Sequence, residues 1–195
     1  MRKTVSIVMV LVSMFFFSGL AHAASKVLVV YYSRDGHTKM VAEGLAEKWD
    51  ATIEGILDLK KREGAIATAK AGTDAVLHKT TDIQFPLNDP FQYDLILIGT
   101  PAWFSNMTPA IRTYLTEFDL LEKDVAFFAT CHKVGADKAT QQMAELVFGK
   151  EAKGIPQLPL THHDLDAERL EGKIETFYAS IAPNNAMKEV FNETT

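Results

Sequence analysis

Apolar segments of strand length alternate with helical patterns along almost the whole chain, and this alternation limits the fold more than any other feature. Residues 26–32 form a continuous run of β-branched and aromatic residues without polar alternation. Such a run is typical of a strand whose two faces are both covered. Pro156 and Pro159 place the last apolar segment at an edge of the sheet, because proline cannot donate a backbone hydrogen bond. The predicted strands are 26–32, 52–57, 94–99, 125–130 and 154–160.

Between the apolar runs, hydrophobic residues recur at spacings of three and four, as on the buried face of a helix. Val41 and Leu45 show this spacing in the first pattern. Thr108 and Pro109 predict a helix start, because threonine favours the capping position and proline the first turn. The predicted helices are centred on 41–49, 65–78, 111–118, 139–147 and 170–181. Strands that alternate with helices predict a parallel sheet with helices on both faces.

The first 23 residues have the pattern of a secretory signal peptide. Arg2 and Lys3 precede an apolar run over 5–20, and Ala-His-Ala at 21–23 supplies small residues for cleavage. An uncleaved membrane anchor is the alternative, but this run is shorter than the roughly 20 residues that a span requires. We therefore expect the signal peptide to be cleaved and the mature protein to have no stable membrane span. We also expect export, and the type of signal peptide suggests the bacterial periplasm.

Length, charge and cysteine content narrow the class of protein further. The chain of 195 residues predicts one domain, over 24–182, followed by a polar tail over 183–195. Its formal net charge of −5 disfavours nucleic acid as a partner. Cys131 is the single cysteine, so an internal disulfide is impossible and stability must come from an ordinary core.

The loop over 33–38, after the first strand, is the first candidate binding loop. Ligands of open parallel sheets bind beyond the carboxyl ends of the strands. The loop reads Ser-Arg-Asp-Gly-His-Thr and opens a helix, whose free N–H groups and dipole favour an anion. Gly36 allows the backbone to approach that anion closely. A plain strand-to-helix turn favours similar residues, so this loop alone leaves both interpretations open.

The loop over 99–106 is the second candidate. It reads Gly-Thr-Pro-Ala-Trp-Phe-Ser-Asn, and it sets Trp103 beside Phe104 at the end of an apolar strand. A flat heteroaromatic ligand can stack on either ring, and we expect at least one ring to face such a ligand. The alternative is that both rings turn inward beneath the next helix.

Three segments together resemble the flavodoxin family. Residues 31–38 resemble its phosphate loop, 93–103 its second flavin loop with the preceding strand, and 125–130, leading to Gly135, the strand before its third loop. The three matches occur in the family's order, each at a strand end, within a similarity that covers 26–181. This resemblance implies a flavodoxin-like, doubly wound α/β sandwich of three layers. Its five-stranded parallel sheet would have the order 2-1-3-4-5, with FMN at the switch point between strands one and three.

Carried over by position, the resemblance implies three sets of contacts to FMN. The phosphate loop would contribute Ser33, Arg34, Asp35, Gly36, His37 and Thr38. The isoalloxazine ring would be flanked by Thr100, Pro101, Ala102, Trp103 and Phe104. The backbone around Thr130, Cys131 and His132 would reach the pyrimidine edge of the ring.

Two positions depart from the family's pattern. Asp35 stands where the family usually has a hydroxyl residue, and a carboxylate beside a phosphate weakens binding unless it points away or Arg34 or His37 offsets it. The third loop, over 131–135, lacks the tyrosine that covers the outer flavin face in many flavodoxins. This departure implies a more open flavin edge.

Several other residues invite a functional interpretation. We expect Cys131 to be a small packed residue rather than a redox thiol. His132 either donates to the flavin or is solvated. The sequence Thr-His-His-Asp at 161–164, with Asp166, suggests a metal site, but helix capping by an aspartate is the simpler interpretation. We therefore predict no metal.

The leading functional hypothesis is a flavin-dependent redox protein, in which FMN performs the electron or hydride transfer. It includes a one-electron carrier that docks to a redox partner protein and a reductase linked to NAD(P)H or a quinone. No side chain is required as a catalytic acid or base. The alternative, from a different class, is a non-redox binding module that has kept the flavodoxin-like fold and lost FMN.

Overall fold

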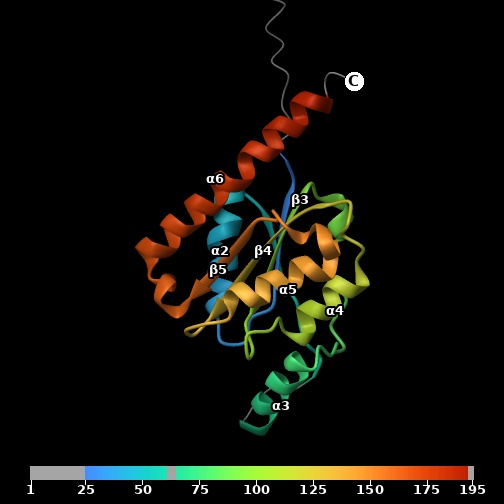
Figure 1. The fold of residues 1–195 in the computed structure, drawn as a ribbon, viewed down its shortest axis with the longest axis vertical. Helices are drawn as coiled ribbons and strands as arrows, with labels where there is room; N and C mark the ends of the chain where they lie inside the picture. Colours follow the sequence, from blue (N-terminus) through green and yellow to red (C-terminus); the bar gives the residue numbers. More distant parts are fainter. Residues whose placement is uncertain (1–24, 61–64, 193–195) are drawn as a thin grey trace, which may run out of the picture.

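The computed structural model describes residues 25–60 and 65–192, so the predicted signal peptide lies outside the described residues. Five strands form one sheet in the order β2-β1-β3-β4-β5, and every neighbouring pair is parallel. The strands are β1 (Val27–Tyr31), β2 (Thr52–Gly55), β3 (Leu95–Pro101), β4 (Asp124–Cys131) and β5 (Gln157–Thr161). The order and the parallel directions confirm the predicted fold class, and β5 lies at an edge, as its prolines predict (Figure 1).

Helices cover both faces of this sheet (Figure 1). The α-helices are α2 (His37–Trp49), α3 (Ala65–Val76), α4 (Pro109–Glu117), α5 (Ala136–Phe148) and α6 (Ala167–Asn192). Within the described residues, the short 3₁₀ helices are η1 (Pro90–Gln92), η2 (Gly149–Ala152) and η3 (His162–Leu165). Helices α4 and α5 pack on one face and α2 and α6 on the other, whereas α3 projects from the lower end of the molecule in Figure 1.

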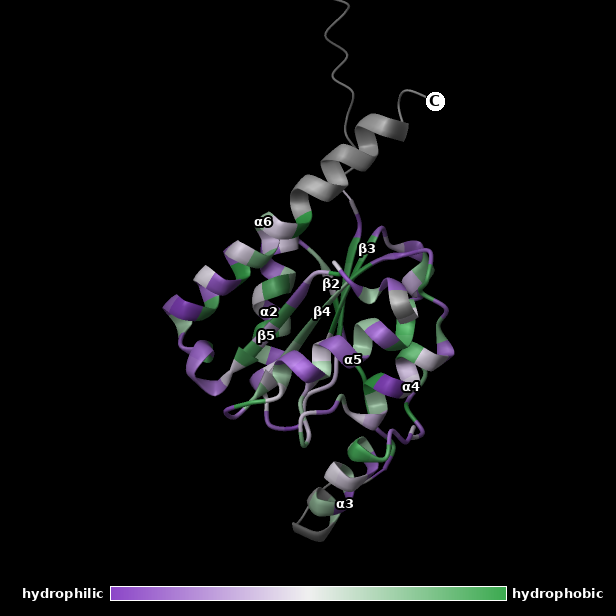
Figure 2. Ribbon diagram, viewed as in Figure 1, coloured by the Kyte–Doolittle hydropathy of each residue, from purple (hydrophilic) through white to green (hydrophobic). Residues whose placement is uncertain are grey.

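The two faces of the sheet form two separate hydrophobic cores. On β1, Leu28 and Val30 pack towards α4 and α5, whereas Val27 and Val29 pack towards α2 and α6. Successive side chains of a strand point to opposite faces. Odd and even positions must therefore both be apolar when both faces are covered. This requirement explains the unbroken apolar runs in the sequence, and Figure 2 shows the central strands as the most hydrophobic part of the fold.

Two element ends differ from the sequence-based expectation. Helix α6 continues to Asn192, beyond Pro183, where we placed the start of a polar tail. Proline removes one N–H donor, but the residues after it keep theirs and can continue the helix. Strand β2 ends at Gly55, two residues earlier than its apolar pattern predicts, and Leu57 is exposed.

None of the helices in the described ranges is both long enough and apolar enough to cross a lipid bilayer.

Gly99 provides a test of how closely β3 and β4 are packed. It is paired with Phe128, and a Cβ atom added to Gly99 would lie 2.0 Å from Phe128 Cζ in the buried core. We expect Gly99→Ala to lower the free energy of unfolding by about 1–3 kcal/mol, because the ring must move. Urea unfolding of the purified protein measures this change.

Gly172→Ala on the exposed side of α6 is the matched control, since a Cβ atom there meets nothing within 4 Å. It should leave stability unchanged or raise it by up to about 1 kcal/mol, because alanine favours the helix. If both substitutions change the free energy of unfolding equally, the contact with Phe128 does not determine the effect of Gly99→Ala.

Candidate functional site

A cavity of about 350 Å³ lies beyond the carboxyl ends of the strands. Its volume falls within the usual range for small-molecule sites, about 300–1,000 Å³. Loops after β1, β3, β4 and β5 all contribute to its wall. The lining residues are Ser33, Arg34, Asp35, His37, Thr38, Pro101, Ala102, Trp103, Thr130, Cys131, His132 and His162. The structure thus brings together all the predicted site residues except Gly36, Thr100 and Phe104, and it adds His162.

Gly36 fixes the geometry of the first loop as the N-cap of α2. Its φ angle of +87° lies in the left-handed region, which explains the glycine at this position. The hydroxyl of Ser33 accepts a hydrogen bond from Gly36 N at 3.2 Å, and no side chain caps the N-terminus of α2. The N–H groups of the first turn and the helix dipole therefore favour an anion beside the cavity.

Arg34 pairs with Asp35 on the same loop. Two guanidinium nitrogens donate to the two carboxylate oxygens, each at 3.1 Å, and the hydrogen bond to Asp35 raises the pKa of Arg34. The guanidinium carbon also lies 5.6 Å from the ring centroid of Trp103, a distance typical of a cation–π contact. Arg34 therefore offsets the charge of Asp35, one of the arrangements that the sequence leaves open for this aspartate.

The two aromatic residues of the second loop lie in different places. Trp103 is on the cavity wall, and its ring meets Tyr32 edge to face with centroids 5.7 Å apart. Phe104 is 71% exposed and does not line the cavity. A Cβ atom on Gly72 of α3 would lie 2.1 Å from the Phe104 ring, so the ring rests on this glycine. One of the two rings thus faces the cavity.

A tight turn over residues 103–106 carries both rings and is held by contacts on both sides. Trp103 and Asn106 exchange backbone hydrogen bonds of 2.9 and 3.1 Å. Gln142 of α5 donates to Asn106 Oδ1 at 2.6 Å. A Cβ atom on Gly135 would lie 2.2 Å from Ser105 Oγ, so the second and third loops are in direct contact. These contacts fix the orientation of Trp103 before any ligand arrives.

Thr100 is fully buried and organises the loop rather than lining the cavity. Its hydroxyl accepts from Thr108 N at 3.0 Å and lies 3.1 Å from the Thr108 hydroxyl. Thr108 occupies the predicted capping position of α4, but its hydroxyl is engaged with Thr100 and caps no helical N–H group. The pair joins the end of β3 to the start of α4.

The third loop is tied to the first by a pair of hydroxyls. Thr38 Oγ1 of α2 and Thr130 Oγ1 of β4 are 2.8 Å apart, and both residues are buried. Next to this pair, burial raises the pKa of the Cys131 thiol. The nucleophilic thiolate is therefore disfavoured at neutral pH, in keeping with the expectation of a packed cysteine.

His162 is the lining residue that sequence reasoning assigned to no binding role. It begins η3, directly after β5, and its ring centroid lies 5.1 Å from that of His37 and 5.7 Å from that of His132. We call these three residues the histidine cluster. The position of His162 at a strand end was the available signal, because the carboxyl end of β5 meets the same edge as those of β1 and β4.

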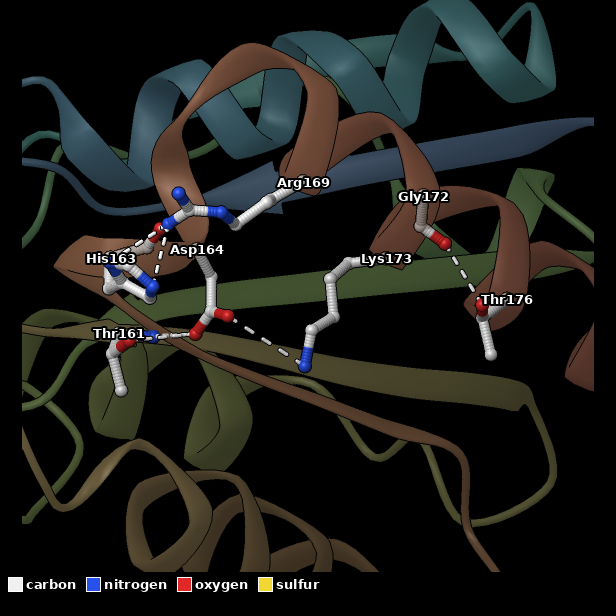
Figure 3. Close-up of polar contacts among 7 residues, drawn as sticks. All are labelled: Thr161, His163, Asp164, Arg169, Gly172, Lys173 and Thr176. Carbon is white, nitrogen blue, oxygen red and sulfur yellow. Dashed lines mark hydrogen bonds and ion pairs between the residues drawn. The ribbon is translucent and has the colours of Figure 1, made fainter.

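Asp164 has the capping role that its sequence context suggests. Its carboxylate accepts from Thr161 N at 2.8 Å and from the Thr161 hydroxyl at 2.7 Å, and these bonds lower its pKa (Figure 3). Over residues 25–60 and 65–192, no group of three or more His, Cys, Asp or Glu side chains is arranged to hold a metal ion.

Comparison with known proteins gives consistent matches over most of the chain. The family model described as flavodoxin matches residues 26–153. An NAD(P)H dehydrogenase (quinone) from Cupriavidus metallidurans is 32% identical over 146 residues, and the match covers 68% of this chain and 71% of the relative.

Solved structures show the same architecture. A flavoprotein from Lactobacillus acidophilus, crystallised in complex with FMN, is 25% identical with a TM-score of 0.55, and the match covers 75% of this chain and 99% of that one. An oxidised flavodoxin from Bacillus cereus is 17% identical with a TM-score of 0.52, covers 82% of this chain and 99% of its own, and supports the fold alone.

Proposed function

This chain belongs to the flavodoxin family, and we propose that it is an exported redox protein that holds one FMN in the cavity beyond β1, β3 and β4. One observation carries the proposal: an uncapped helix N-terminus and an indole ring line the same cavity. The first suits a phosphate and the second a flat conjugated ring system. FMN contains both groups.

The lining residues fit FMN in chemical type. The N-terminus of α2, with Arg34 and His37, would hold the phosphate. Trp103 and the loop residues before it would hold the isoalloxazine ring, and the backbone at 130–132 would reach the pyrimidine edge. When bound, FMN supplies the electron or hydride transfer, while the protein positions and tunes it.

For the electron donor or acceptor, we propose a small nicotinamide or quinone. The relative from Cupriavidus metallidurans supports this choice by its name. The third loop supports it physically, because the loop has no tyrosine to cover the flavin and Val134 is 80% exposed. An open flavin edge leaves room for a second planar molecule. A carrier that docks only to a redox partner protein is the competing version.

The export proposal rests on the sequence over 1–23, with its basic start, apolar run and Ala-His-Ala ending. Expression in a bacterial host with an outer membrane should yield a mature protein that begins at Ala24, recovered from the periplasmic fraction. Intact mass spectrometry of that fraction checks both points. A full-length chain that stays with the membranes would contradict cleavage.

Trp103 and Phe104 form a matched pair for testing the site. We expect Trp103→Leu to weaken FMN binding about tenfold, because the indole face on the cavity wall is lost. Phe104→Leu should change the affinity less than about twofold, since the Phe104 ring rests on Gly72 outside the cavity. Quenching of flavin fluorescence on titration gives both dissociation constants.

Circular dichroism on both variants checks that each remains folded. If wild-type protein shows no saturable FMN binding, the proposed function fails and the non-redox binding module is favoured. If Phe104→Leu weakens binding as strongly as Trp103→Leu, the assignment of Trp103 as the stacking residue is wrong.

Stopped-flow mixing of the FMN-loaded protein with NADH or NADPH separates a reductase from a pure carrier. We expect bleaching of the flavin absorbance to saturate with nucleotide concentration, followed by reoxidation on addition of a soluble quinone. Free FMN at the same concentration is the control for reduction without protein. Reduction no faster than in this control, with either nucleotide, would favour the carrier.

A further inference from the structure

The histidine cluster joins three loops at one side of the cavity. His37 stands at the start of α2, His132 follows β4, and His162 follows β5. The His162 ring lies between the other two, with centroid distances of 5.1 Å to His37 and 5.7 Å to His132. All three side chains line the cavity. The cluster therefore places His162, from the end of a fourth strand, beside His37 of the phosphate loop.

The segment that carries His162 is held firmly on both sides. Before it, Thr161 shares a capping box with Asp164, whose carboxylate also lies 3.8 Å from Lys173 Nζ (Figure 3). After it, His163 turns away to Arg169 of α6, which donates to its carbonyl oxygen at 2.8 Å. His162 N itself donates to His132 O at 3.3 Å. The backbone thus presents the His162 ring to the cavity without reliance on a ligand.

We propose that His162 is a cofactor-binding residue from a fourth loop, which recognises the phosphate of FMN together with His37 and makes FMN binding stronger as the pH falls. The inference rests on the proposed function, because it names a further ligand and a regulation of the same site. An imidazolium ion adds a full positive charge to the partial charge of the α2 N-terminus. Its ring N–H groups are hydrogen-bond donors to phosphate oxygens.

The other charged groups beside the phosphate loop are already paired. Arg34 would also contact the phosphate, but its charge is offset by that of Asp35. On α2, Lys39 pairs with Glu43 at 3.6 Å.

Other elements beside η3 are similarly engaged. On α6, Arg169 donates to the carbonyl oxygen of His163, and Lys173 forms an ion pair with Asp164. Asp137 of α5 lies near the Cys131 thiol, and burial keeps that thiol protonated. His37, His132 and His162 are thus the lining groups that gain a positive charge when they take up a proton.

The sign of the pH effect follows from linkage. A phosphate dianion stabilises an imidazolium ion, so bound FMN favours the protonated form of His162 over the neutral form. FMN binding is then coupled to proton uptake. The extra affinity that His162 supplies is therefore present at low pH and is lost as the pH rises.

The test compares His162→Gln with the matched variant His163→Gln, whose side chain contacts Arg169 and is not among those that line the cavity (Figure 3). Calorimetric titration with FMN at about pH 6.5 and about pH 8.5 gives the affinities. We expect His162→Gln to lose about tenfold at the lower pH and less than about twofold at the higher, with His163→Gln close to wild type at both. Measurements in two buffers of different ionisation enthalpy should show proton uptake on binding to wild type and less uptake for His162→Gln.

Riboflavin, which lacks the phosphate, is the ligand control, and its affinity should be the same for all three proteins at both pH values. The titration of the FMN phosphate itself, whose second pKa is about 6, affects all three proteins equally and therefore cancels in the comparison between them. The inference is wrong if both variants behave alike, if the loss is independent of pH, or if riboflavin shows the same loss. The absence of FMN binding to wild type would overturn the proposed function instead, so the two failures are distinguishable.

Discussion

Burial of the parallel sheet on both faces is the constraint on which the rest of the structure depends. The middle of each central strand must be apolar on both sides, because successive side chains enter different cores. Polar and ligand-binding chemistry is therefore confined to the ends of the strands. Since all five strands run in the same direction, loops that are far apart in the sequence meet at one edge. The cavity is a consequence of this arrangement, and four loops contribute to it.

A small set of buried hydroxyls holds these loops in place. The Thr38–Thr130 pair joins the helix start to the end of β4, and the Thr100–Thr108 pair joins β3 to α4. Each hydroxyl satisfies another in a dry environment, where an unpaired polar group costs roughly 1–3 kcal/mol. The loops are thus positioned by the scaffold, and a ligand meets a site that is already organised. Such preorganisation reduces the entropy lost on binding.

The sequence predicted the fold and most of the cavity wall because both depend on local patterns. Unbroken apolar runs identify covered strands, and the residues that follow each run must reach the carboxyl edge. The directions of side chains within a loop are set by tertiary contacts, and these are invisible in the chain. Thr100 points inward to Thr108, and Phe104 turns to Gly72, although both flank residues that line the cavity. His162 was assigned no role in FMN binding, because the sequence at 161–164 suggested only a metal site or helix capping. Its position beside His37 and His132 depends on the fold. The end of α6 was misplaced because proline weakens a helix locally without ending it in every context.

The contact between Phe104 and Gly72 links the turn of the second loop to the size of one residue on a different element. Phe104 and Ser105 both adopt positive φ angles, so the turn that directs the indole ring inward directs the phenyl ring outward. The phenyl ring packs on α3 at a position where the backbone carries no Cβ atom. Any side chain at position 72 would displace the ring, because its Cβ atom would lie 2.1 Å from the ring. Helix α3 therefore supports the outer side of this turn, although no described residue of α3 lines the cavity.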